Sequence, residues 1–134
     1  MILCDAGPLV ALADANDQHH RKCLSSFKEM KEPLWTVWIV VFEAMYLLAD
    51  RLDYQEFVWQ MLERGAVQLL SVDLDDIPRI RELMRKYADR PMDLADAALV
   101  RTAEREGIHT IFTVDKSDFL VYRLHGRVRM TVIP

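Results

Sequence analysis

The sequence predicts an α/β fold in which helices alternate with the strands of a mostly parallel sheet. Short apolar runs alternate along the chain with longer segments whose apolar residues have helical spacing. The 134 residues are 51% hydrophobic, which is enough for one continuous core. No repeat, low-complexity tract or linker rich in Gly, Ser or Pro divides the chain, so residues 1–134 are predicted to form a single domain.

Five short apolar runs are predicted to be strands. They are residues 2–5, 34–37, 67–72, 110–114 and 129–133. Because helical segments separate most of them, crossover connections and parallel pairing are expected.

Seven helical segments are expected, at residues 8–13, 17–30, 40–51, 54–64, 74–87, 93–106 and 118–123. Gly7 breaks the first strand, and its missing side chain is expected to let a ligand approach the backbone. Pro8 suits a first helical position. Pro33 follows the second helix, and Gly107 is expected to cap the sixth.

Acidic residues stand where predicted strands end and helices begin. Asp5 and Asp115 each close an apolar strand, and Asp93 and Asp96 lie three residues apart at the start of one helix. Glu43 lies in an apolar helix that offers it no obvious exposed face. In open α/β sheets, ligands bind at the carboxyl ends of the strands. The sequence therefore predicts a site at this edge.

A cluster of carboxylates implies a cation. Neighbouring carboxylates repel one another and raise one another's pKa unless a positive charge neutralises them. No His or Cys pattern accompanies the acids: the adjacent His19 and His20 would point about 100° apart on a helix, and Cys4 and Cys23 are expected to be packing residues. Mg²⁺ or Mn²⁺ is therefore favoured over zinc, and these ions serve phosphoryl chemistry.

Several of the acids also have a structural interpretation. Asp5 could begin a turn. Asp93 and Asp118 could each be the N-cap of a helix, with Asp96 interacting with the helix dipole. The coincidence of these acids at one edge favours a site.

Four motifs follow one another along the chain: Ile-Leu-Cys-Asp-Ala-Gly-Pro-Leu at 2–9, Thr36 followed by Glu43-Ala44, Met-Asp-Leu-Ala-Asp-Ala-Ala-Leu at 92–99, and Thr-Val-Asp-Lys-Ser-Asp-Phe at 113–119. In this order and spacing they resemble the PIN domain, and more closely the VapC-type toxin ribonucleases of bacterial and archaeal toxin–antitoxin pairs. The resemblance covers nearly the whole chain.

The resemblance implies a three-layer α/β/α domain that hydrolyses RNA internally with a metal-activated water. It implies one or two Mg²⁺ or Mn²⁺ ions, with Asp5 and Asp96 as direct ligands and Asp115 and Glu43 acting through water. Asp93 and Asp118 are similar to accessory acids of some members. One departure is Ala6, where many members carry a Ser or Thr whose hydroxyl supports the metal site.

The formal charge of −4 initially argues against a nucleic-acid partner. If six of the 21 acids face a metal, 15 remain against 17 Lys and Arg, so the rest of the protein carries +2. The cations expected to flank the site and meet RNA phosphates are Lys116, Arg101, Arg105, Arg123, Arg127 and Arg129.

An RNA substrate, a cognate antitoxin and a second copy of the chain are the expected partners. Trp35, Trp38 and Trp59 are expected in the core or at a subunit interface, and the segment from Phe57 to Met61 offers an apolar surface. No apolar run is long enough for a membrane span, and no signal segment begins the sequence, so a cytoplasmic location is expected.

Two other functions compete with this interpretation. A haloacid-dehalogenase-like phosphatase also begins with a strand-end Asp, but it needs a second Asp at the position of Gly7. A catalytically silent domain could bind RNA or protein without cutting, and the four core acids argue against it.

Overall fold

A five-stranded parallel sheet forms the centre of the computed structural model, which describes all residues from 1 to 134. The strands are β1 (Ile2–Cys4), β2 (Leu34–Thr36), β3 (Val67–Leu69), β4 (Thr110–Phe112) and β7 (Thr131–Ile133), in the order β3-β2-β1-β4-β7. All four neighbouring pairs are parallel. The predicted α/β class and all five predicted strands are confirmed, although each strand is shorter than expected.

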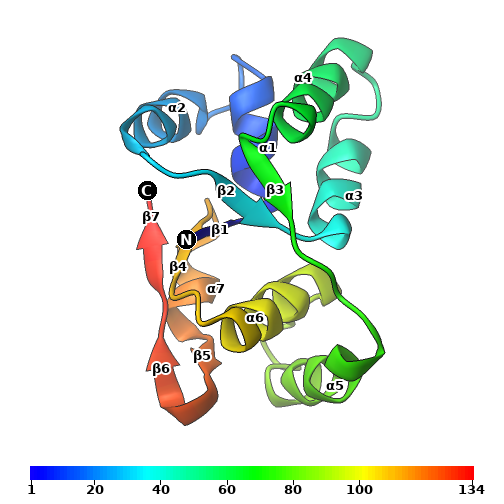
Figure 1. The fold of residues 1–134 in the computed structure, drawn as a ribbon, viewed down its shortest axis with the longest axis vertical. Helices are drawn as coiled ribbons and strands as arrows, with labels where there is room; N and C mark the ends of the chain where they lie inside the picture. The colour runs from blue at the N-terminus through cyan, green and yellow to red at the C-terminus, as the bar shows by residue number, and fades with distance from the viewer.

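Helices cover the sheet in two groups (Figure 1). Helices α1 to α4 lie in the upper half of the view and α5 to α7 in the lower half, with β1, β2 and β4 between them. The helices are α1 (Ala6–Ala13), α2 (His20–Glu29), α3 (Trp38–Leu47), α4 (Leu52–Glu63), α5 (Ile77–Lys86), α6 (Leu94–Glu106) and α7 (Lys116–Val121). This is the expected three-layer α/β/α arrangement.

The central strand β1 positions the predicted site. Its neighbours are β2 on one side and β4 on the other, so the chain changes direction along the sheet at β1. In open α/β sheets, ligands bind at the carboxyl ends of the strands where the strand order reverses, which here are β1 and β4. Asp5 directly follows β1 and so lies at this position.

Helix boundaries differ from prediction in several places, and polar side chains cap two of the helical segments concerned. The first helix begins at Ala6 rather than Pro8, because Asp5 is its N-cap and accepts a hydrogen bond from the Ala6 N–H. The predicted helix 74–87 begins with a 3₁₀ turn, Leu74–Asp76, that Asp73 caps before α5 starts. Gly107 ends α6 in the left-handed conformation, with φ of 67°, as expected.

The structure also contains a small antiparallel pair of strands, β5 (Arg123–Leu124) and β6 (Val128–Arg129), that was not predicted. Each strand has two residues, too few to show an alternating pattern. The predicted last strand, 129–133, therefore divides into β6 and β7.

The core surrounds the sheet and includes residues from helices of both groups. All three residues of β1 are buried, and eight of the 13 residues of α6 are buried, four of them alanines that let the helix approach the sheet. Cys4 and Cys23 are both buried and unpaired, as expected for packing residues. None of the helices has the length and hydrophobicity that a membrane crossing requires.

Candidate metal centre

Asp5 is held in place by three contacts at the end of β1. Its backbone N–H donates to the Phe112 carbonyl over 3.0 Å, which extends the β1–β4 pairing by one residue. Its carboxylate is buried, and Oδ1 accepts from the Ala6 N–H over 2.8 Å while Oδ2 accepts from the Thr113 hydroxyl over 2.9 Å. The carboxylate therefore has a fixed orientation before any ligand binds.

Thr113 joins the ends of β1 and β4, and sequence reasoning did not single it out. Its hydroxyl donates to Asp5 and accepts from the Asp115 backbone N–H over 3.0 Å. Ala6 has no hydroxyl to offer Asp5, and Thr113 supplies one from the neighbouring strand. Its place two residues before Asp115 was the available signal.

Asp96 lies in the first turn of α6, with its backbone and its carboxylate held by different residues. The Asp93 carboxylate accepts from the Asp96 N–H over 2.8 Å, so Asp93 is the N-cap that the sequence allowed. The Tyr122 hydroxyl donates to Asp96 Oδ2 over 2.8 Å. Asp96 is 9% exposed, whereas Asp93 is exposed.

Glu43 and Asp115 are more accessible. Glu43 is half-buried on α3, and the outer face of that helix carries exposed Trp38, Phe42 and Tyr46. The prediction that this helix offers Glu43 no exposed face is therefore wrong. Asp115 is exposed at the N-cap position of α7, and it makes no side-chain capping hydrogen bond.

Burial and mutual repulsion raise the pKa values of these carboxylates. Burial is the main cause in every case; it raises the pKa of Asp5 to about 6, of Glu43 to about 7 and of Asp96 to about 8. Asp5 adds to the pKa increase of both Glu43 and Asp96 by charge repulsion. The pKa of Asp115 is also raised, by burial and then by Asp118 and Asp93. These mutual effects show that the predicted acids share one electrostatic environment.

No cation of the protein neutralises this environment. Asp5, Glu43, Asp93, Asp96 and Asp115 make no ion pair with any Arg, Lys or His. Other acids of the chain do have partners, including Asp118, whose Oδ1 lies 3.1 Å from Arg90 Nε. An oxygen-only set of unpaired acids fits a hard divalent cation.

The acidic side chains are not arranged around one common metal position. No three His, Cys, Asp or Glu side chains are arranged to hold one ion. Mg²⁺ usually keeps several waters and takes one or two carboxylates directly, so two direct ligands meet its ordinary requirement.

Asp118 is the remaining predicted acid, and it is not an N-cap. It lies in the first turn of α7, which begins two residues earlier than predicted. Its pairing with Arg90 distinguishes it from the unpaired acids.

Three of the six predicted RNA-binding cations make contacts within the protein. Arg101 and Arg105 both contact the buried carboxylate of Asp76, at 2.8 Å and 2.7 Å. The Arg123 side chain donates to the carbonyls at the end of α7. Of the predicted cations, Lys116, Arg127 and Arg129 are exposed and make no ion pair.

Gly7 has a packing role. A Cβ at this position would overlap with Cγ2 of Val114, so the absent side chain accommodates Val114. The expectation that it lets a ligand approach the backbone is wrong, and Gly7 instead allows α1 to lie against the end of β4.

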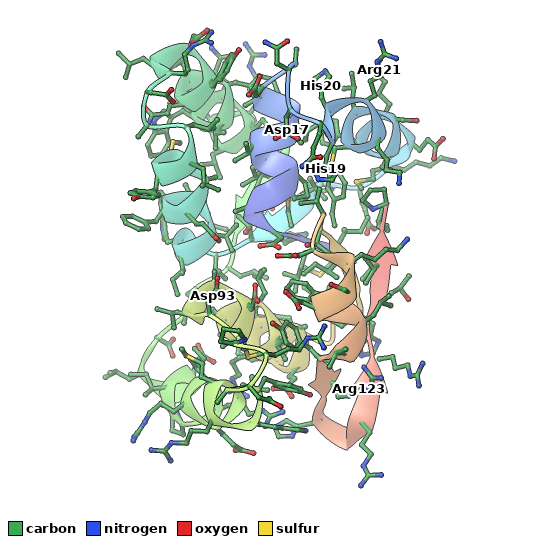
Figure 2. All side chains as sticks on the ribbon, turned by 180° about the vertical axis from the view of Figure 1, so that it is seen from behind. Asp17, His19, His20, Arg21, Asp93 and Arg123 are labelled. Carbon is green, nitrogen blue, oxygen red and sulfur yellow. The ribbon has the colours of Figure 1, made fainter.

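The histidines lie apart from the acids. Figure 2 shows His19 and His20 at the start of α2, well separated from Asp93 at the start of α6. His20 Nδ1 lies 2.6 Å from the Ala11 carbonyl, which ties α2 to α1. The histidines are therefore not part of the acidic cluster.

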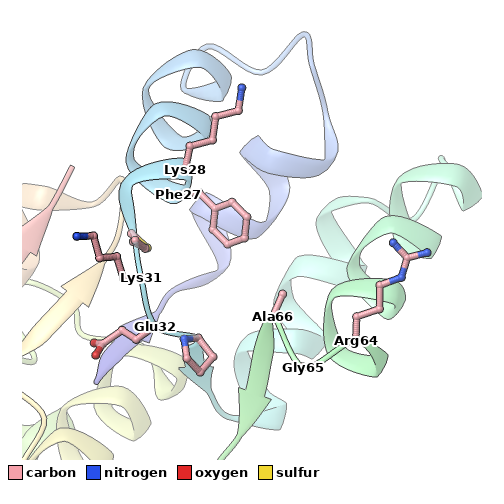
Figure 3. Close-up of a pocket in the computed structure, with 9 residues that line it drawn as sticks. Phe27, Lys28, Lys31, Glu32, Arg64, Gly65 and Ala66 are labelled. Carbon is pink, nitrogen blue, oxygen red and sulfur yellow. The ribbon is translucent and has the colours of Figure 1, made fainter.

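The largest hollow, about 490 Å³, also lies away from the acids. It is lined by the end of α2 and the connection from α4 to β3, and Phe27 extends into the space between them (Figure 3). Pro33 and Ala66 in its lining precede β2 and β3, so the hollow lies at the amino ends of the strands. The acids occupy the opposite edge of the sheet.

Comparisons with known proteins agree on one family. Residues 2–123 match the PIN domain. The chain is 32% identical to Ribonuclease VapC26 of Mycobacterium tuberculosis over 135 aligned residues, which cover 99% of this chain and 100% of that protein.

Solved structures share the fold. The crystal structure of Mycobacterium tuberculosis VapC20, a Sarcin-Ricin loop cleaving toxin, has a TM-score of 0.76 and 20% identity, covering 88% of this chain and 94% of that one. A toxin–antitoxin complex from Klebsiella pneumoniae has a TM-score of 0.69 and 17% identity, covering 90% and 92%. With the sequence relative and the domain match, these similarities lead to one conclusion: the chain belongs to the PIN-domain family, as a VapC-type toxin ribonuclease.

Proposed function

We propose that this protein is a Mg²⁺- or Mn²⁺-dependent endoribonuclease in which residues 1–134 act as one domain. The observation that carries the proposal is the group of unpaired carboxylates at the carboxyl ends of β1 and β4. Burial and mutual repulsion make their negative charge unfavourable without a cation. A divalent ion would remove that penalty.

The proposed direct ligands are Asp5 and Asp96, with Glu43 and Asp115 acting through water. Asp5 and Asp96 are the buried members, and each is oriented by a neighbouring hydroxyl group. Glu43 and Asp115 are more exposed and so have room for a water molecule. When bound, the ion would activate water for hydrolysis of the phosphodiester.

Asp93 and Asp118 are assigned lesser roles. Asp93 holds the Asp96 backbone and adds negative charge near the ion. Asp118 is already neutralised in part by Arg90. We propose that both are accessory acids rather than ligands.

The proposed substrate is cytoplasmic RNA, and the proposed regulator is a cognate antitoxin. Lys116 stands beside Asp115, where an exposed ammonium group can meet a phosphate. Antitoxin control is supported by the similarity to the toxin–antitoxin complex from Klebsiella pneumoniae. The proposed location of the protein is therefore the cytoplasm, where it would encounter both RNA and antitoxin.

We also propose a homodimer through the outer face of α3. Trp38, Phe42 and Tyr46 follow one another at intervals of four residues and are 57%, 72% and 73% exposed. The exposed ring of Trp59 lies 6.4 Å from that of Trp38 and extends this surface onto α4. Neighbouring Val58 and Met61 are buried and belong to the core.

Cleavage of structured and unstructured RNA tests the function. The wild type is expected to cut with Mg²⁺ or Mn²⁺ and to stop when EDTA removes the ion. Asp5→Asn and Asp96→Asn are expected to lose at least about 100-fold in rate, since loss of an outer-shell partner alone costs 10- to 100-fold. Asp17→Asn, far from the cluster, is the control. A wild type that cuts no RNA would instead support a silent binding domain.

A further inference from the structure

Tyr122 is a buried tyrosine whose hydroxyl makes one hydrogen bond, to a proposed metal ligand. The side chain is 1% exposed, and its hydroxyl donates to Asp96 Oδ2 over 2.8 Å. Tyr122 directly follows α7, whereas Asp96 lies at the start of α6. The contact therefore joins two elements that the sequence keeps apart.

The ring of Tyr122 is fixed by two other aromatic rings. Tyr87 packs edge-on, with ring centroids 5.1 Å apart, and Phe119 does the same at 5.2 Å. The Tyr87 hydroxyl also accepts from the Arg123 backbone N–H over 3.0 Å, which anchors the chain next to Tyr122. The Tyr122 hydroxyl thus has little freedom to move away from Asp96.

The two oxygens of the Asp96 carboxylate have different hydrogen bonding. Oδ2 accepts from Tyr122, whereas no hydrogen bond is made to Oδ1. Since no buried side-chain oxygen lacks a hydrogen-bond partner, Oδ1 reaches the surface of the protein. Turning both carboxylate oxygens away from Tyr122 would leave its buried hydroxyl without an acceptor, which is unfavourable.

We propose that Tyr122 is a positioning residue that holds the Asp96 carboxylate with Oδ1 free to bind the divalent ion. This proposal rests on the proposed function, because it requires Asp96 to be a ligand. Asp93 fixes the backbone of Asp96 and Tyr122 fixes its side chain. Partners of metal ligands commonly orient them in this way.

The test compares two phenylalanine substitutions within one aromatic cluster. Tyr122→Phe removes the hydroxyl that contacts Asp96, and Tyr87→Phe removes a hydroxyl from the adjacent ring that contacts the backbone instead. Both variants keep the aromatic packing. Binding of Mn²⁺ is measured from the electron paramagnetic resonance signal of the free ion, under conditions where circular dichroism shows each variant folded.

Tyr122→Phe is expected to weaken Mn²⁺ binding about 10-fold, and Tyr87→Phe by less than about 2-fold. Cleavage by Tyr122→Phe should return toward the wild-type rate at saturating metal, which a general loss of structure would not allow. Equal Mn²⁺ affinity in the wild type and in both variants would overturn the proposal. In the same titration, an unchanged affinity of Asp96→Asn would overturn the metal site itself, so the two failures are distinguishable.

Discussion

The Thr113 hydroxyl lies between two acids of the site, donating to Asp5 Oδ2 over 2.9 Å and accepting from the Asp115 backbone N–H over 3.0 Å. Thr113 is 1% exposed, so no water can replace this hydroxyl without rearrangement. The ends of β1 and β4 are thus joined by one side chain.

Replacing Thr113 by valine keeps the shape of the side chain and removes both hydrogen bonds. Mn²⁺ affinity and the rate of RNA cleavage are expected to fall about 10-fold, because the Asp5 carboxylate loses one of the two hydrogen bonds that orient it. Thr113→Ser, which keeps the hydroxyl, should stay close to the wild type. A valine variant with wild-type Mn²⁺ affinity in a titration would show that Asp5 needs no such support.

The raised pKa values predict an unusual dependence of stability on pH. The folded protein holds protons on Asp5 up to a pKa of about 6 and on Asp96 up to about 8, whereas the unfolded chain releases them near the ordinary value of 3.8. Between these values the folded state binds more protons, so its stability decreases as pH rises. With about 1.4 kcal/mol for each pKa unit, the metal-free protein should lose at least about 2 kcal/mol between about pH 5 and pH 8.

Urea unfolding in EDTA at a series of pH values measures this loss. Asp96→Asn should flatten the dependence, because it removes the carboxyl with the highest pKa of the cluster. Saturating Mg²⁺ should stabilise the wild type most at the alkaline end, where the carboxylates are charged. A stability that rises steadily with pH in EDTA would be inconsistent with raised pKa values.

The position of the candidate site was largely predictable from the sequence, for a physical reason. Acids that follow apolar strands must lie at the carboxyl edge of a parallel sheet, so local pattern alone located Asp5 and Asp115. The contacts of Thr113 and Tyr122 join residues 108 and 26 positions apart, and no local pattern reports such pairs.

The errors have a common origin as well. Arg101 and Arg105 were expected to face RNA because the charge of a side chain can be read from a sequence, whereas the direction in which it points cannot. Both side chains point to Asp76 instead. Gly7 was assigned to ligand approach because the contact with Val114 depends on how α1 packs against β4. The β5–β6 pair was missed because two-residue strands have no period to detect.

Asp76 is expected to matter for stability and not for catalysis. Its carboxylate is 1% exposed and pairs with both Arg101 and Arg105 of α6. It makes no hydrogen bond with any proposed metal ligand. Asp76→Asn should lower the free energy of unfolding by about 3 kcal/mol, since one partner of a buried ion pair is removed.

The neighbouring Asp75 gives a matched control, because it is exposed and makes no ion pair. Asp75→Asn should change the free energy of unfolding by less than about 0.5 kcal/mol. Urea unfolding at neutral pH measures both variants. Equal stability of the two would show that the Asp76 pairs contribute nothing.

The exposed aromatic face of α3 predicts the oligomeric state. Phe42→Ser removes a ring that is 72% exposed, so it should weaken a dimer without disturbing the core. Light scattering is expected to give a dimeric mass for the wild type and a monomeric mass for the variant at the same concentration. A monomeric wild type, measured without antitoxin, would exclude the proposed homodimer.

The most direct measurement for the proposed metal centre is an anomalous difference map from a crystal soaked in Mn²⁺. A peak is expected at the carboxyl ends of β1 and β4, within ligand distance of Asp5 and Asp96, and it should be lost in Asp96→Asn crystals. A peak at another position, such as beside His19 and His20, with none near Asp5 would exclude the proposed metal centre.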